Sequence, residues 1–182
     1  FFKIKNRNSR FILNKFISNS LLNWSSLDKL DLKKAQNKMD TTDEAFENLK
    51  VIQNVFLHCF YDSQKTEFFF KNLISNTKID FSRYNYFYAK YLVRNGKINQ
   101  AKIVLDSSLE LHPRNLLLNQ YRLDLNNNIN GNKFDCQNQS HVAAEILYIT
   151  ANALSSQSIY KFSNFYLNLA KYLNSDFYSY NT

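Results

Sequence analysis

The sequence predicts an all-α protein, and three observations support this prediction. Apolar residues recur at helical spacing along most of the 182-residue chain. The chain holds only 2 Gly and 1 Pro, too few for a protein rich in β-turns or flexible linkers. Short polar turns separate the periodic stretches into pairs. The hydrophobic fraction of 45% is enough for a packed core, and the length fits a single domain.

The clearest helix pair lies between residues 82 and 115. Tyr84, Tyr88 and Leu92 form one apolar stripe, and Asn95-Gly96 ends it, because Gly adopts a left-handed conformation without a Cβ clash. Pro113 ends the second run, since Pro lacks the amide donor that a continuing helix needs. The second run places its apolar residues at Ile98, Ala101, Leu105 and Leu109. Two short amphipathic helices joined by a tight turn are expected to pack as an antiparallel hairpin.

These residues resemble a tetratricopeptide (TPR) repeat, a helix hairpin of about 34 residues. With Ser82 as the first position of the repeat, this sequence has small residues, a large apolar residue, a turn glycine and a final proline at the positions where the family has them. The matching residues are Ala89, Gly96, Ala101, Leu105, Ser108 and Pro113. In the family, the small residues lie where the two helices cross closely.

The flanking segments are interpreted as degenerate copies of the same unit. We expect hairpins at 8–39 and 44–76, a single helix at 115–126, a loop insertion at 127–141 and a terminal hairpin at 143–175. With Ala144 as first position, the three small sites of the terminal hairpin fall on Ala151, Ser163 and Ala170. This closing segment resembles the terminal repeat of uncharacterised bacterial TPR proteins.

The resemblance implies a right-handed superhelical α-solenoid of antiparallel helix hairpins that forms one domain over residues 1–182. The sequence begins without Met and ends just after a helical pattern, so we expect a fragment of a longer array. No apolar run reaches the ~18 residues of a membrane-spanning helix. We therefore expect a soluble fragment, with a cytoplasmic or a periplasmic location both open.

Neither a catalytic site nor a metal-binding site is expected from the Cys and His residues. Cys136 and His141 lie five residues apart, which suits a Cys–His nucleophile, but no orienting acid accompanies them. The preferred interpretation is a loop held by Phe134, with Cys136 as a small buried anchor. His58 and Cys59 are adjacent and point about 100° apart on a helix, which disfavours joint metal binding. The two cysteines do not define a disulfide framework. We expect neither an enzyme nor a cofactor.

A binding function is the main expectation, because first helices line the concave groove of TPR arrays. The residues expected there are Arg83, Tyr86, Lys90, Arg94, Tyr148 and Asn152. Arg and Tyr suit an acidic or aromatic peptide, since both types dominate binding hot spots. The family's carboxylate clamp is not expected, because Tyr148 stands in place of its Lys. A solvated basic face is an equally weighted interpretation of the same residues.

Two other functions stay open at this point. The net charge of +8 suits an RNA-binding helical-repeat protein. However, no pair of base-reading residues recurs between the hairpins. Nucleic acid is therefore not the expected partner. The chain could also be the helper region of a larger enzyme whose catalytic domain lies elsewhere. A protein–protein interaction scaffold remains the first hypothesis.

Overall fold

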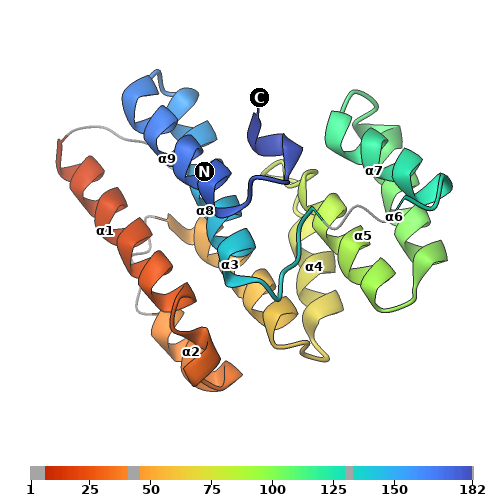
Figure 1. The fold of residues 1–182 in the computed structure, drawn as a ribbon, viewed down its shortest axis with the longest axis horizontal. Coiled ribbons are helices and arrows are strands. Elements are labelled where there is room, and N and C mark those ends of the chain that lie inside the picture. The colour runs from red at the N-terminus through yellow and green to blue at the C-terminus, as the bar shows by residue number, and fades with distance from the viewer. Residues whose placement is uncertain (1–6, 41–45, 130–132, 182) are drawn as a thin grey trace. The chain divides into compact units, whose positions relative to one another are not determined.

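The structure is a computed structural model that describes residues 7–40, 46–129 and 133–181. All regular elements in these ranges are helical, which confirms the all-α prediction (Figure 1). In chain order they are α1 (Arg7–Trp24), η1 (Leu27–Lys29), α2 (Leu32–Asp40), α3 (Glu47–Phe60), α4 (Thr66–Ile74), α5 (Tyr84–Arg94), α6 (Ile98–Leu111), α7 (Leu116–Asn126), α8 (Gln139–Ser155), α9 (Tyr160–Leu173) and η3 (Tyr178–Asn181).

The chain divides into two compact units, which are described separately. Unit 1 comprises residues 1–63 and 134–182 and contains α1 to α3, α8, α9 and η3. Unit 2 comprises residues 64–133 and contains α4 to α7. Unit 1 is therefore built from the two ends of the chain, and unit 2 from the segment between them.

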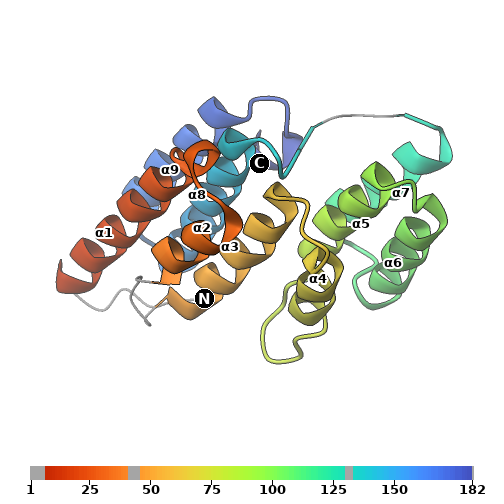
Figure 2. The ribbon, with the colours of Figure 1, turned by 90° about the horizontal axis from the view of Figure 1, so that it is seen from below.

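Helix α8 is the centre of unit 1. Most of its side chains are buried, including Ile146, Leu147 and Leu154, as expected for a helix in the core. It packs against α9, α1 and α3 (Figure 2). If the hairpins were stacked in strict chain order, α8 would not contact α1 and α3, because these two helices belong to the first two expected hairpins and α8 belongs to the last.

Small residues let α8 and α9 approach closely. Ala151 and Ala170 are 1% and 0% exposed, and Ser163 is 6% exposed. The Ser163 hydroxyl donates a hydrogen bond of 2.8 Å to the carbonyl oxygen of Ala151. These are the residues expected at the small positions of the terminal hairpin, and all three lie inside the unit.

Unit 2 has an aromatic core between paired helices. Helix α5 contacts α4, α6 and α7. The ring of Phe70 on α4 stacks on Tyr88 of α5, with centroids 5.4 Å apart. Ala89, Ala101 and Leu105 are all 0% exposed, so the small and large positions expected between the two helices are buried. Ser108 is also buried.

Four helices end with the same backbone turn. In α3, α5, α7 and α8 the chain passes through a residue with positive φ, and the next amide donates to the carbonyl oxygen five residues earlier, as in a Schellman motif. The positive-φ residues are Asp62 (48°), Gly96 (74°), Asn128 (54°) and Ser158 (61°). The hydrogen bonds are Ser63 to His58, Lys97 to Leu92, Ile129 to Asp124 and Ile159 to Leu154, between 2.8 and 3.0 Å long.

These turns are regularly spaced along the sequence. The distance from residue 62 to 96 is 34 residues, from 96 to 128 it is 32, and from 128 to 158 it is 30. Among these four positions, the sequence predicts positive φ only at Gly96, because Gly adopts it without a Cβ clash, whereas Asp, Asn and Ser adopt it less often.

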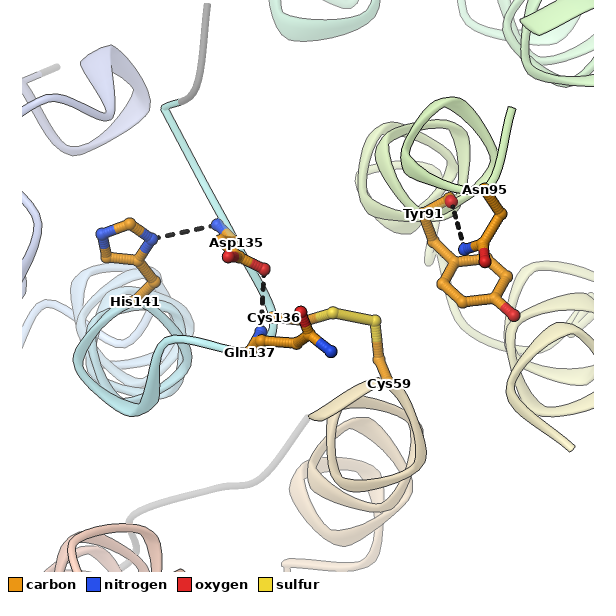
Figure 3. Close-up of a disulfide and its surroundings, with 7 residues drawn as sticks. All are labelled: Cys59, Tyr91, Asn95, Asp135, Cys136, Gln137 and His141. Atoms are coloured by element: carbon orange, nitrogen blue, oxygen red, sulfur yellow. Dashed lines mark hydrogen bonds between the residues drawn. A yellow bond between two sulfur atoms is a disulfide. The ribbon is translucent and has the colours of Figure 1, made fainter. Parts of the chain in front are cut away.

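A disulfide joins Cys59 of α3 to Cys136, with Cα atoms 5.8 Å apart (Figure 3). This corrects the interpretation that the two cysteines do not form a disulfide framework. They lie 77 residues apart, and spacing alone does not reveal that α3 and the segment before α8 meet in unit 1. Phe134 is 3% exposed, and its ring centre lies 5.5 Å from that of Phe56. Its burial agrees with the predicted loop held by Phe134.

Candidate functional site

The first candidate surface is the basic side of α5 in unit 2. Arg83, Lys90 and Arg94 fall on one stripe of the helix, because their spacings of seven and four residues return to the same side. We call these three residues the α5 basic stripe. Arg94 is exposed, and the other two are half-buried.

Aromatic rings support each cation of the α5 basic stripe. The Arg83 guanidinium lies 5.6 Å from the ring centre of Phe87, and that of Arg94 lies 5.5 Å from Tyr91. The Lys90 ammonium lies 5.6 Å from the ring centre of Tyr121 on α7. At these distances the ring quadrupole attracts the cation, which restrains the side chain. Tyr91 also accepts a backbone hydrogen bond of 2.9 Å from the Asn95 side chain (Figure 3).

Tyr86 does not belong to this surface, which corrects its expected place in the groove. It is 3% exposed, and its ring centre lies 4.9 Å from Tyr121 and 5.2 Å from Phe87. The reason is that α7 packs over this side of α5, so Tyr86 becomes a core residue between the two helices. Burial also raises the pKa of Tyr121 well above that of a free tyrosine.

The second candidate surface is the side of α8 in unit 1 that carries Tyr148 and Asn152. Asn152 is exposed and Tyr148 is half-buried. The ring of Tyr148 lies 5.0 Å from that of Tyr180 in η3. Part of the surface expected to bind a partner is therefore covered by the chain's own C-terminal segment.

The candidate nucleophile and metal ligands have structural roles. Cys136 and Cys59 are bonded to each other, so neither presents a thiolate. The Asp135 amide donates to Nδ1 of His141 over 2.9 Å, and the Gln137 amide donates to the Asp135 carboxylate over 2.9 Å (Figure 3). These bonds order the turn that leads into α8. Within the described residues no group of three or more His, Cys, Asp or Glu side chains is arranged to hold a metal ion.

Each unit also contains a surface hollow. In unit 2 a hollow of about 750 Å³ lies between the α4–α5 connection and α6, with Ile79, Phe81 and Val104 among its lining residues. In unit 1 a hollow of about 380 Å³ lies between α1, α8 and α9, with Trp24, Leu147 and Tyr172 among its lining residues. Both linings are mainly apolar, and neither contains a residue of the two candidate surfaces.

Comparison with known proteins gives no relative. No protein-family model, curated protein or solved structure matches this chain. The resemblance to TPR proteins thus rests on the residues themselves. None of the helices in the described part of the chain is long and apolar enough to cross a membrane.

Proposed function

We propose that the chain is a non-catalytic protein–protein interaction scaffold whose helix pairs are TPR-like hairpins. The observation that carries the proposal is the recurrence of one helix-ending turn at residues 62, 96, 128 and 158. Intervals of 34, 32 and 30 residues are close to the ~34-residue period of TPR units. The right-handed superhelical order of a whole array stays a prediction.

The two best hairpins support the proposal because they agree position by position. Gly96 and Ser158 occupy the same position of the expected repeat, and both have positive φ. The small residues at the helix crossing, Ala101 and Ser163, also correspond, and both are buried. Repeat hairpins of this kind typically present a binding surface rather than a catalytic centre.

The α5 basic stripe is the proposed binding surface for a partner with an acidic segment. Arg and Lys side chains one or two helical turns apart can contact successive carboxylates of an extended peptide. The rings beneath Arg83, Lys90 and Arg94 restrain these side chains before binding, which lowers the conformational entropy lost on association. The net charge of +8 adds favourable long-range steering of an acidic partner.

The test uses a fluorescent glutamate-rich peptide and fluorescence anisotropy at low and high salt. The wild-type chain should bind the peptide, with affinity falling as salt rises. The triple variant Arg83→Glu/Lys90→Glu/Arg94→Glu should lose binding. The matched control is Arg10→Glu/Lys15→Glu/Lys161→Glu, which reverses three exposed cations of unit 1 and changes net charge equally. Equal loss in both variants would mean that total charge, not the α5 basic stripe, binds the peptide.

A second arm separates a protein partner from RNA. Partners captured from a lysate by the wild-type chain are compared with those captured by the triple variant, with and without RNase. A protein partner that depends on the stripe and survives RNase supports the scaffold. RNase-sensitive capture would favour the RNA-binding alternative.

A further inference from the structure

The hollow of unit 2 recurs at the same place in a second helix hairpin. Corresponding positions of the α5–α6 and α8–α9 hairpins are 62 residues apart, as Gly96 and Ser158 are. At this offset α6 and α9 begin and end at corresponding residues, and each is 14 residues long. Residues 77, 78, 81, 85, 107 and 111 line the hollow of unit 2, and the corresponding residues 139, 140, 143, 147, 169 and 173 line that of unit 1. The two hollows are therefore one feature that both hairpins share.

Two buried positions of the hairpin are apolar in unit 1 and polar in unit 2. Leu147 of α8 and Ala170 of α9 are 1% and 0% exposed. The corresponding residues of unit 2 are Asn85 of α5 and Ser108 of α6, which are 9% and 5% exposed and line the hollow. Burying a polar side chain costs free energy unless it is hydrogen-bonded. Apolar packing, which explains these positions in unit 1, therefore does not explain them in unit 2.

The polar side chains beside the hollow of unit 2 are only partly hydrogen-bonded. The Asn85 side chain donates a hydrogen bond of 3.0 Å to the carbonyl oxygen of Ser82. This bond uses one of its two N–H groups and does not involve its own oxygen. The Ser108 hydroxyl is buried and has no hydrogen-bond partner among the described residues. Such groups are rare in folded proteins, because an unpaired buried hydroxyl is destabilising. A ligand that bonds to Ser108 would remove this cost.

The size of the hollow and the charges around it define the kind of ligand. Its volume of about 750 Å³ falls in the range of small-molecule sites. Its charged lining residues Lys78 and Asp80 have opposite signs and are both exposed, and His112 is half-buried. The buried polar residues Asn85 and Ser108 are neutral. A charged ligand group beside them would lose its hydration without gaining an opposite charge, so a neutral polar group fits better.

We propose that the hollow of unit 2 binds a small neutral molecule that has an apolar body and a hydroxyl group. The ligand hydroxyl bonds to Ser108 and Asn85, because a hydroxyl both donates and accepts and so matches both side chains. The apolar body lies against the apolar lining residues, which include Ile79, Phe81 and Val104. No residue of the α5 basic stripe lines this hollow, so the inference goes beyond the protein-binding function proposed above.

The first test compares two ligands that differ only in a hydroxyl group, 2-naphthol and naphthalene. Each is titrated into the ¹⁵N-labelled full-length chain and followed by NMR. 2-Naphthol should bind about threefold to tenfold more tightly than naphthalene, as expected for a hydrogen bond between neutral groups. The amide resonances that shift should be those of residues 74–85 and 103–112. Equal affinities, shifts confined to other residues, or no binding of 2-naphthol up to its solubility limit would overturn the proposal.

The second test removes the hydroxyl of Ser108. Ser108→Ala introduces the residue that α9 has at the corresponding position, Ala170, and breaks no hydrogen bond, so the variant should fold. It should bind 2-naphthol about threefold to tenfold more weakly and naphthalene with unchanged affinity. Ser140→Ala is the control, because Ser140 lines the hollow of unit 1. Equal losses in both variants, or wild-type affinity of Ser108→Ala for 2-naphthol, would overturn the assignment. If Ser108→Ala does not fold, the two ligands decide the question with the wild-type chain.

Discussion

The hydroxyl of Ser163 on α9 lies 2.8 Å from the backbone carbonyl oxygen of Ala151 on α8 and donates a hydrogen bond to it. A side chain with one heavy atom beyond Cβ therefore reaches the backbone of the neighbouring helix. The helices can approach this closely only because both residues are small. In the α5–α6 hairpin the corresponding residues are Ala89 and Ala101, and both are 0% exposed.

Larger side chains at these crossings should destabilise the protein. We expect Ser163→Leu and Ala101→Leu each to lower the free energy of unfolding by about 1–3 kcal/mol, because the added volume has no space in a packed crossing. Urea denaturation followed by circular dichroism measures the loss. Asn164→Leu is the control, since Asn164 is adjacent and exposed. If Ser163→Leu and Asn164→Leu unfold at the same urea concentration, the crossing does not depend on small residues.

The positive-φ turns predict opposite effects of glycine at neighbouring serines. Ser158→Gly should raise the free energy of unfolding by about 1 kcal/mol, because Gly adopts φ of +61° without a Cβ clash. Ser156→Gly should lower it, since Ser156 has right-handed φ and ψ of −62° and −16° and Gly only adds flexibility there. Thermal denaturation of both variants checks the pair. Stabilisation by Ser156→Gly would remove the conformational explanation.

Gly96→Ala provides the reverse substitution. A Cβ at this position meets no atom within 4 Å, so no steric contact with the rest of the protein opposes Ala. The φ of +74° alone should lower the free energy of unfolding by about 1 kcal/mol. A chain that tolerates Ala at residue 96 without loss of thermal stability would contradict this expectation.

The sequence predicts those features that depend on neighbouring residues. Helical periodicity and the Asn95-Gly96 signal are local, so the helices and the turn at 96 could be predicted. The positive φ of Asp62, Asn128 and Ser158 could not, because these residue types adopt it only in some turns, where hydrogen bonds across the turn accompany it.

Features that depend on distant residues were missed. Tyr86 was expected at the surface because α5 alone does not show that Tyr121 of α7 covers it. Nor does sequence spacing show that Cys59 and Cys136 meet. Tyr180 donates a hydrogen bond to the buried carboxylate of Glu145 on α8. Helical periodicity alone does not show that Glu145 is buried.

The disulfide should stabilise unit 1. Its two cysteines are 77 residues apart, and closing a loop of this length raises the free energy of the unfolded chain by about 4.5 kcal/mol in the chain-entropy model. We expect Cys59→Ser/Cys136→Ser to lower the free energy of unfolding by up to that amount. Denaturation with and without reductant tests this. Reductant should affect the wild type and leave the double variant unchanged; identical unfolding of both proteins without reductant would exclude a stabilising bond.

An ion pair between α6 and α7 predicts a small acid dependence of stability. Arg122 donates to both carboxylate oxygens of Asp106 and lowers the pKa of that carboxyl. Because the pKa is lower in the folded state, the stabilisation is present above the unfolded pKa of about 4 and is lost as pH falls through the folded value. Asp106 is half exposed, so solvent screening limits the effect to about 0.5 kcal/mol. Asp106→Asn should flatten this part of the stability profile between pH 5 and pH 2, and an unchanged profile would contradict the assignment.

The bond between Cys59 and Cys136 encloses all of residues 64–133 in one covalent ring, and these residues are those of unit 2. A protease that cuts the chain once inside this ring leaves both fragments attached through the two sulfur atoms. The nicked protein should therefore migrate as one band on a non-reducing gel and as two bands after reduction. Unit 1, whose two sequence segments come from opposite ends of the chain, would keep both of its parts after such a cut.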